Sequence, residues 1–203
     1  MVSSFFYGTI QSALFTLLAV YATSMNFTIL EISIVTFLLA ISGAVAQFPV
    51  GKISDVYDRR KVIIASTFGA AIFAIITIFV SGQMYLPDGL ATSKTWFYIS
   101  FILFSFCSLP MFSLILAHTN DYITKDKFVA AGAGLQFTFG LGAMSGPFLC
   151  SIFMDIVGSN GFFIFLFFFH AVIGVFGVYR MRVRKTVDNP DSQFVAMPQT
   201  ITP

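Results

Sequence analysis

The sequence predicts an all-α membrane protein in which six helices cross the bilayer. Hydrophobic residues make up 57% of the 203 residues and charged residues only 10%, whereas a soluble domain carries about 25% charged residues. The charges gather in clusters, which leaves long uncharged stretches between them. Each stretch is close to the roughly 20 residues that a helix needs to cross a hydrocarbon core about 30 Å thick.

Polar breaks separate the predicted spans. The first two spans are joined by a short turn that holds Asn26 and Glu31, and a polar loop joins the third to the fourth. The fifth is long enough to be tilted or bent at its glycines. We expect 1–185 to form one transmembrane domain and 186–203 to be a disordered polar cytoplasmic tail. The spans are predicted at about 5–25, 32–50, 62–81, 96–119, 128–154 and 162–179.

The basic residues predict the orientation of these spans. Ten of the eleven lysines and arginines follow the second, fourth or sixth span, and only Lys94 lies on the other side. Connections rich in Lys and Arg face the cytoplasm, so we expect both termini to be cytoplasmic. A missed or additional span would scatter these residues over both faces. The expected location is the plasma membrane, specifically a bacterial inner membrane.

Composition argues against several other functions. Cys107 and Cys150 lie inside apolar stretches, where a thiol behaves as a small hydrophobe, so neither a disulfide framework nor a metal site is predicted. The net charge of +2 gives no support for nucleic-acid binding. No Asp or Glu lies deep in a span, so this chain alone cannot assemble a carboxylate proton relay. We expect no cofactor and no catalytic residues, and therefore not an enzyme.

The segment after the second span carries the clearest motif. Residues 51–61 read Gly-Lys-Ile-Ser-Asp-Val-Tyr-Asp-Arg-Arg-Lys. A glycine, an aspartate four residues later and a basic pair ahead of an apolar helix resemble the loop between helices two and three of each half of major facilitator superfamily transporters. Two positions depart from that pattern: Val56 replaces an arginine and Asp58 replaces a second glycine.

A second region extends the resemblance. Residues 110–121 read Pro-Met-Phe-Ser-Leu-Ile-Leu-Ala-His-Thr-Asn-Asp, and residues 140–147 read Gly-Leu-Gly-Ala-Met-Ser-Gly-Pro. They are similar to helices ten and eleven of the YcaD-type branch of the superfamily. The chain thus resembles the C-terminal half of a transporter, a 3+3 inverted repeat. This implies alternating-access transport of a small-molecule substrate, with or without a coupling ion. The other wall of the pathway would be a missing N-terminal six-helix half or a second copy.

The resemblance implies a gating role for Gly51, Asp55, Arg59 and Arg60. A carboxylate at the end of the second span can face a nearby arginine and the positive N-terminal end of a neighbouring helix. We expect Asp55 to dock on the start of the fifth span, near 128–130, and to hold the cytoplasmic side closed with about 1 to 2 kcal/mol. Alternatively, these charges only fix the topology and solvate the loop.

Polar residues inside the spans are the pathway candidates, because such groups are costly to leave unpaired in lipid. In the family's layout the first, second, fourth and fifth helices of a half border the pathway. Interhelical hydrogen bonding without substrate contact would give the same pattern. His118 and Asp121 are three residues apart, so they could form a proton-sensitive pair or an inner-gate hydrogen bond. The candidates are Tyr7, Gln11, Gln47, His118, Asp121 and Gln136.

Small residues in the fifth span predict close helix packing. Gly142 and Gly146 have a small-x-x-x-small spacing, and Pro147 follows them. The pattern fits both a moving interface helix and a tight static contact.

Three other functions are compatible with six membrane-spanning helices, and each requires a different sequence feature. A homodimeric half-size carrier would need a second copy of the six helices. A rhomboid-like intramembrane protease would pair Ser145 with His170, but that family needs a glycine two residues before its serine, where this chain has Ala143. A channel is a weaker alternative than the half-size carrier, because no repeated pore-loop motif is present.

Overall fold

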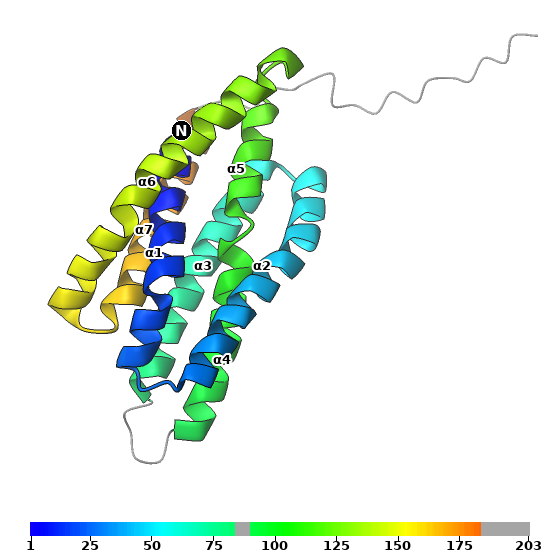
Figure 1. Ribbon diagram of the computed structural model, residues 1–203. Helices are drawn as coiled ribbons and strands as arrows, with labels where there is room; N and C mark the ends of the chain where they lie inside the picture. Colours follow the sequence, from blue (N-terminus) through cyan, green and yellow to red (C-terminus); the bar gives the residue numbers. More distant parts are fainter. Residues whose placement is uncertain (84–89, 184–203) are drawn as a thin grey trace, which may run out of the picture.

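The computed structural model of the chain describes residues 1–83 and 90–183, and the predicted tail at 186–203 lies outside them. Six segments of this part are helices long and apolar enough to cross a membrane, which confirms the all-α polytopic architecture (Figure 1). The helices are α1 (Val2–Ser24), α2 (Ile29–Val56), α3 (Arg59–Gln83), α4 (Leu90–Ser108), α5 (Met111–Asn120), α6 (Phe128–Val157) and α7 (Gly161–Val183), with a 3₁₀ turn, η1 (Lys125–Lys127), before α6.

A capping box fixes where α2 begins. Asn26 has a φ of 58°, which turns the chain away from α1. The Thr28 hydroxyl then accepts the Glu31 N–H at 3.3 Å, while the Glu31 carboxylate accepts the Thr28 N–H at 2.8 Å. The cap therefore starts α2 at Ile29, ahead of the predicted residue 32.

The predicted fourth span, 96–119, is one crossing but not one continuous helix. It consists of α4 and α5, which are separated at Leu109 and Pro110. Proline has no N–H to donate to the preceding turn, and its ring clashes with the carbonyl four residues back. The Tyr7 hydroxyl of α1 donates to the Leu109 carbonyl at 3.0 Å, which gives the break a partner in another helix.

The motif at 51–61 is mostly helical, whereas the sequence predicted a loop. α2 continues through Pro49 to Val56, and α3 begins at Arg59. Only Tyr57 and Asp58 lie between the two helices. The short turn fixes the direction of the charged side chains more firmly than a loop would.

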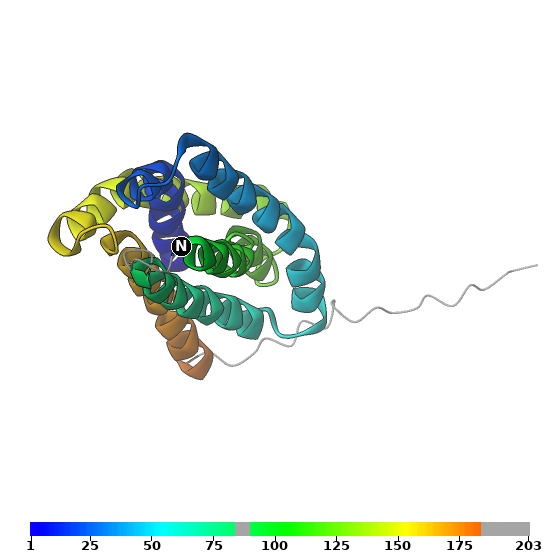
Figure 2. The same ribbon diagram turned by 90° about the horizontal axis from the view of Figure 1, so that it is seen from below.

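The helices differ in how much of their surface is covered. α1 packs mainly along α6, and α3 packs between α4 and α7, with the α4–α5 segment near the centre of the bundle (Figure 2). In the most apolar stretch of each span, 50% of the residues of α1 and of α7 are buried. The corresponding share is 28% in α2 and 17% in α6. The outer faces of α2 and α6 are therefore left to contact lipid or another protein segment.

Aromatic rings form much of the core between α1, α4 and α7. Tyr21 lies 5.1 Å from the Phe162 ring and 5.0 Å from the Phe163 ring, centroid to centroid. The Phe97 and Phe101 rings stack at 5.9 Å. All five side chains are fully buried. Such contacts add about 0.5 to 1.5 kcal/mol per pair beyond area burial, so the core depends on ring geometry as well as on hydrophobicity.

The start of the chain, the last described residues of α7 and the charged connections lie at one end of the bundle, which we call the basic end. It holds the start of α1, the α2–α3 turn, the α5–α6 connection and the end of α7, and it is uppermost in Figure 1. Lys94 lies at the opposite end, where its Nζ pairs with the Glu31 carboxylate of α2 at 2.6 Å.

Candidate functional site

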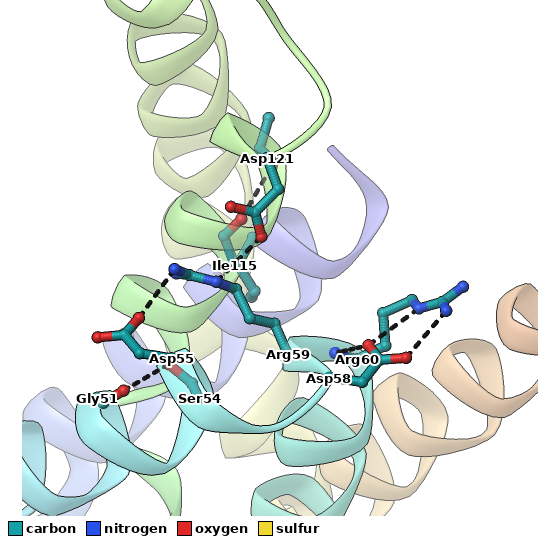
Figure 3. A network of polar contacts seen from close by, with 9 residues as sticks. Gly51, Ser54, Asp55, Asp58, Arg59, Arg60, Ile115 and Asp121 are labelled. Carbon is teal, nitrogen blue, oxygen red and sulfur yellow. Dashed lines mark hydrogen bonds and ion pairs between the residues drawn. The ribbon is translucent and has the colours of Figure 1, made fainter. Parts of the chain in front are cut away.

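Arg59 connects two carboxylates at the basic end (Figure 3). Its Nη2 donates to Asp55 Oδ1 of α2 at 2.9 Å, and its Nε lies 3.0 Å from Asp121 Oδ2 at the end of α5. The planar guanidinium suits this arrangement, because its N–H groups point in fixed directions. Arg59 thus joins the ends of α2, α3 and α5, and we call these three residues the Arg59 network.

Asp58 and Arg60 form a separate, local ion pair beside this network (Figure 3). Asp58 Oδ1 accepts the Arg60 backbone N–H at 3.0 Å, which is an N-cap contact, and Oδ2 accepts from Arg60 Nη2 at 2.9 Å. The Arg60 guanidinium holds the pKa of the Asp58 carboxyl below its ordinary value of 3.8. The position that departs from the family's glycine therefore caps α3.

Replacing Asp58 with alanine is expected to lower stability by about 1 kcal/mol. For a chain of this size that is a fall of roughly 2 to 4 °C in the unfolding midpoint. Because the pKa is lower in the folded state, this contribution is fully present above the ordinary pKa. It is lost as pH falls through the folded value. Thermal unfolding at pH 7 and in mild acid measures it.

The matched variant is Asp58→Asn, since asparagine caps helices about as well as aspartate. It should retain most of the stability at pH 7 while losing the acid dependence. Equal destabilisation by Asp58→Ala and Asp58→Asn would contradict the capping role. The stabilisation would then come from the charge of Asp58 alone.

Asp55 makes one of its two expected contacts. Its carboxylate pairs with Arg59, one of the arginines that the sequence predicted, and this is its only ion pair within the described residues. The expected docking on residues 128–130 is not found among them. The Asp55 side chain is 67% exposed. The helix that is tied to the α2–α3 turn in this conformation is α5, through Asp121, and not α6.

A cavity of about 450 Å³ opens beside the Arg59 network. His118 borders it and packs edge-on against Tyr122, with ring centroids 5.0 Å apart. No hydrogen bond joins His118 to Asp121 among residues 1–83 and 90–183, and the Asp121 carboxylate pairs with Arg59 instead. The proposed His118–Asp121 bond is therefore absent from this conformation. Other side chains lining the cavity include Arg60, Ile63, Ile115 and Arg180.

The remaining pathway candidates lie in different surroundings. Gln47 of α2 is exposed, and its Oε1 accepts from the Ser113 hydroxyl of α5 at 3.0 Å. Tyr7 is fully buried and bonded to the α4–α5 break. Gln136 is exposed and Gln11 is half-buried, and neither side chain makes a hydrogen bond in the described part of the chain. The structure thus brings Gln47 to α5 but does not gather all the candidates into one cluster.

The glycines of α6 lie against the backbone of α1. A Cβ added at Gly142 would overlap the Phe5 carbonyl, and one added at Gly146 would overlap the Thr9 carbonyl. Thr9 Oγ1 also donates to the Gly142 carbonyl at 3.2 Å. Pro147 follows within α6, which continues past it. Gly51, by contrast, has no atom within 4 Å of an added Cβ, so crowding does not require glycine there.

The serine and histidine of the protease alternative face different partners. Ser145 Oγ donates to the Gly142 carbonyl at 2.8 Å, whereas His170 Nε2 lies 3.0 Å from Ser108 Oγ. His170 Nδ1 lies 2.7 Å from the Leu166 carbonyl oxygen. Both ring nitrogens of His170 are therefore engaged away from Ser145.

Sequence reasoning missed three contributors to the site. Ser113, the partner of Gln47, has no distinguishing pattern in the sequence. Ser108 could not be distinguished from other intramembrane serines, because its hydrogen bond with His170 depends on how the helices pack. The capping role of Asp58 could have been found, because an aspartate directly ahead of a helix start is an N-cap pattern.

Six apolar helices long enough to cross a membrane, with the charged α2–α3 turn at the basic end, are the features of a polytopic membrane protein. The chain belongs to the Major Facilitator Superfamily, whose sequence model matches residues 1–202.

Several curated relatives share this family. An uncharacterized MFS-type transporter from Yersinia enterocolitica is 23% identical over 190 residues, which cover 94% of this chain and 44% of the relative. The uncharacterized MFS-type transporter YfkF from Bacillus subtilis is 27% identical over 168 residues, covering 80% of this chain and 39% of YfkF. The chain thus spans less than half the length of these relatives. No solved structure matches the chain significantly.

Proposed function

We propose that this chain forms the C-terminal six-helix half of a carrier that moves a small solute across a bacterial inner membrane by alternating access. The family match and the coverage of less than half of each relative support this assignment. The other wall of the pathway is then an N-terminal six-helix half. A second copy of the chain is the alternative, favoured only by the exposed outer faces of α2 and α6.

The observation that carries the mechanism is the contact between Arg59 and Asp121. The break at Pro110 separates α5 from α4, so the basic end of α5 depends on contacts with its neighbours. Arg59 ties that end to the α2–α3 turn. The Arg59 network is proposed as a latch that sets the position of α5, the segment that carries His118 and borders the cavity.

The expected strength of the latch is modest. The Arg59 side chain is 26% exposed and that of Asp121 44%, and ion pairs of this kind contribute about 0.2 to 1 kcal/mol. A contribution near 1 kcal/mol changes the ratio of two conformations by about fivefold. That is sufficient to bias a transport cycle without arresting it.

A labelling experiment tests the latch. Thr119→Cys, in a background without Cys107 and Cys150, places a thiol at the cavity wall. Adding Arg59→Gln or Asp121→Asn should raise the rate of thiol labelling about fivefold. The double variant should label no faster than either single one, because both changes break the same contact.

Two further variants serve as controls. Lys52→Gln removes a cation at the same end that lies outside the network, with its Nζ 4.5 Å from the Phe48 ring centroid. It should leave the rate unchanged. Asp55→Asn should have a smaller effect than Asp121→Asn, since Asp55 is more exposed. Unchanged labelling in the Arg59 variant, or equal increases with Lys52→Gln, would remove the support for a latch.

Alternating access itself is tested on the chain together with its other half. A cysteine at Gln11 should react with impermeant reagents added to either side of sealed vesicles. Cysteines at Asn26 and Lys127 should react from opposite sides only. Labelling of Gln11→Cys from one side alone, under all conditions, would contradict a carrier in which this residue lines the pathway.

A further inference from the structure

A groove of about 350 Å³ runs between α3 and α7 at the basic end. Its floor is apolar and is made by Ile64 and Ala65 of α3 with Val178 and Met181 of α7. One cation from each helix completes the lining, Lys61 from α3 and Arg182 from α7. An apolar floor with two cations matches an amphiphilic ligand that carries a negative charge.

Close packing of the two helices shapes this groove. Gly177 of α7 lies against Ile64, so that an added Cβ would be 2.9 Å from the Ile64 side chain. Gly174 approaches the Phe68 ring in the same way. The small residues let α7 approach α3 closely and leave the longer Lys61 and Arg182 side chains at the rim. Both helices lie side by side in Figure 2.

The charges of Lys61 and Arg182 determine which ligands this groove can attract. Within the described residues, neither Lys61 nor Arg182 is in an ion pair, and both are exposed. Asp58, which lies three residues before Lys61 in the sequence, is already paired with Arg60. Uncompensated positive charge beside an apolar surface, at the end of membrane-crossing helices, is the arrangement that attracts acidic lipid head groups.

We propose that this groove binds an acidic glycerophospholipid from the surrounding leaflet. Its phosphate lies between Lys61 and Arg182, and an acyl chain covers Ile64, Ala65, Val178 and Met181. Arginine supplies directed N–H donors and lysine a compact charge, which together suit a phosphate. A lipid fits better than a free phosphate ion, which would leave the apolar floor uncovered. This site is on α3 and α7 and includes none of the three residues of the Arg59 network.

Native mass spectrometry of the full chain in uncharged detergent tests this assignment. Phosphatidylglycerol is expected to bind more tightly than phosphatidylcholine. The Lys61→Gln/Arg182→Gln double variant should lose roughly thirtyfold in affinity for phosphatidylglycerol, which corresponds to about 1 kcal/mol for each cation. Lys125→Gln/Lys127→Gln removes the same charge at the same end but outside the groove, and should lose far less.

Charge-conserving and soluble-anion controls separate the remaining explanations. The Lys61→Arg/Arg182→Lys variant keeps both charges and should retain lipid binding. If it also lost binding, the loss in the glutamine variant would reflect a folding defect at these two positions and not the missing charge. Equal losses in the 61/182 and 125/127 variants would overturn the site in favour of a diffuse charge effect. Binding of inorganic phosphate or glycerol 3-phosphate as tightly as phosphatidylglycerol would assign the cations to a soluble anion and overturn the lipid. None of these measurements depends on transport.

Discussion

The Gly142→Val variant is expected to unfold at a clearly lower temperature than the unaltered chain. The added side chain would meet the Phe5 carbonyl and lie close to the Thr9 backbone nitrogen, 3.1 Å from the position of a Cβ. Both obstacles are backbone atoms of α1, so neither can rotate away. Overpacking of this kind costs about 1 to 3 kcal/mol, and the rigid surroundings place Gly142 at the upper end. This is a fall of roughly 6 to 12 °C.

Gly140 supplies the matched control, because it lies on the same helix and no atom comes within 4 Å of an added Cβ. Gly140→Val should leave the midpoint within a few degrees. Heating in the presence of a thiol-reactive dye gives the measurement, since Cys150 is fully buried and becomes reactive on unfolding. If Gly142→Val and Gly140→Val unfolded at the same temperature, the close contact between α1 and α6 would not be the reason that position 142 requires glycine.

The His170→Ala variant is expected to show the second large effect. The imidazole is fully buried, it packs edge-on against Phe104 at 5.5 Å, and both nitrogens have partners. The Leu166 carbonyl can only accept, so Nδ1 carries the hydrogen and Nε2 accepts from the Ser108 hydroxyl. Truncating an aromatic side chain in a core costs about 3 to 5 kcal/mol. The same thermal measurement applies.

Two companion variants separate the ring from its hydrogen bonds. Ser108→Ala removes one hydrogen bond and should cost about 0.6 kcal/mol, the average for such bonds between membrane helices. His170→Phe keeps the ring volume and should be far milder than His170→Ala. A Ser108→Ala effect as large as that of His170→Ala would show that the hydrogen bond, and not the packing, holds α7 against α4.

Much of the architecture could be predicted from the sequence, because the lipid environment selects long apolar stretches as membrane-spanning helices. Backbone groups in lipid must be bonded within helices, so long uncharged stretches specify helices almost without regard to their detailed order. The basic residues around Arg59, Lys125 and Arg180 predicted which connections share one end, and the structure places them together. The superfamily is confirmed, while the YcaD-type branch and the cytoplasmic location of the basic end stay predictions.

The details of the site were less predictable because they depend on which helices meet. Pro110 was visible in the sequence, but a proline can bend a helix or divide it, and the outcome depends on neighbours such as Tyr7. Asp55 had an arginine and the start of α6 as possible partners, and its pairing with Arg59 alone depends on how the helices pack at the basic end. Ser113 and Ser108 gained meaning only when Gln47 and His170 were placed opposite them.

If α5 tilts during transport, the hydrogen bond from Tyr7 to Leu109 marks the point about which it would pivot. Ten residues of helix separate this fulcrum from Asp121, a lever arm of about 15 Å at 1.5 Å per residue. Tilting that arm by roughly 10° would carry its tip about 2.6 Å, comparable with the 3.0 Å between Arg59 and Asp121. A small tilt of α5 at Leu109 would therefore break the contact between Arg59 and Asp121 at the basic end. The hydrogen bond between Tyr7 and Leu109 would hardly move.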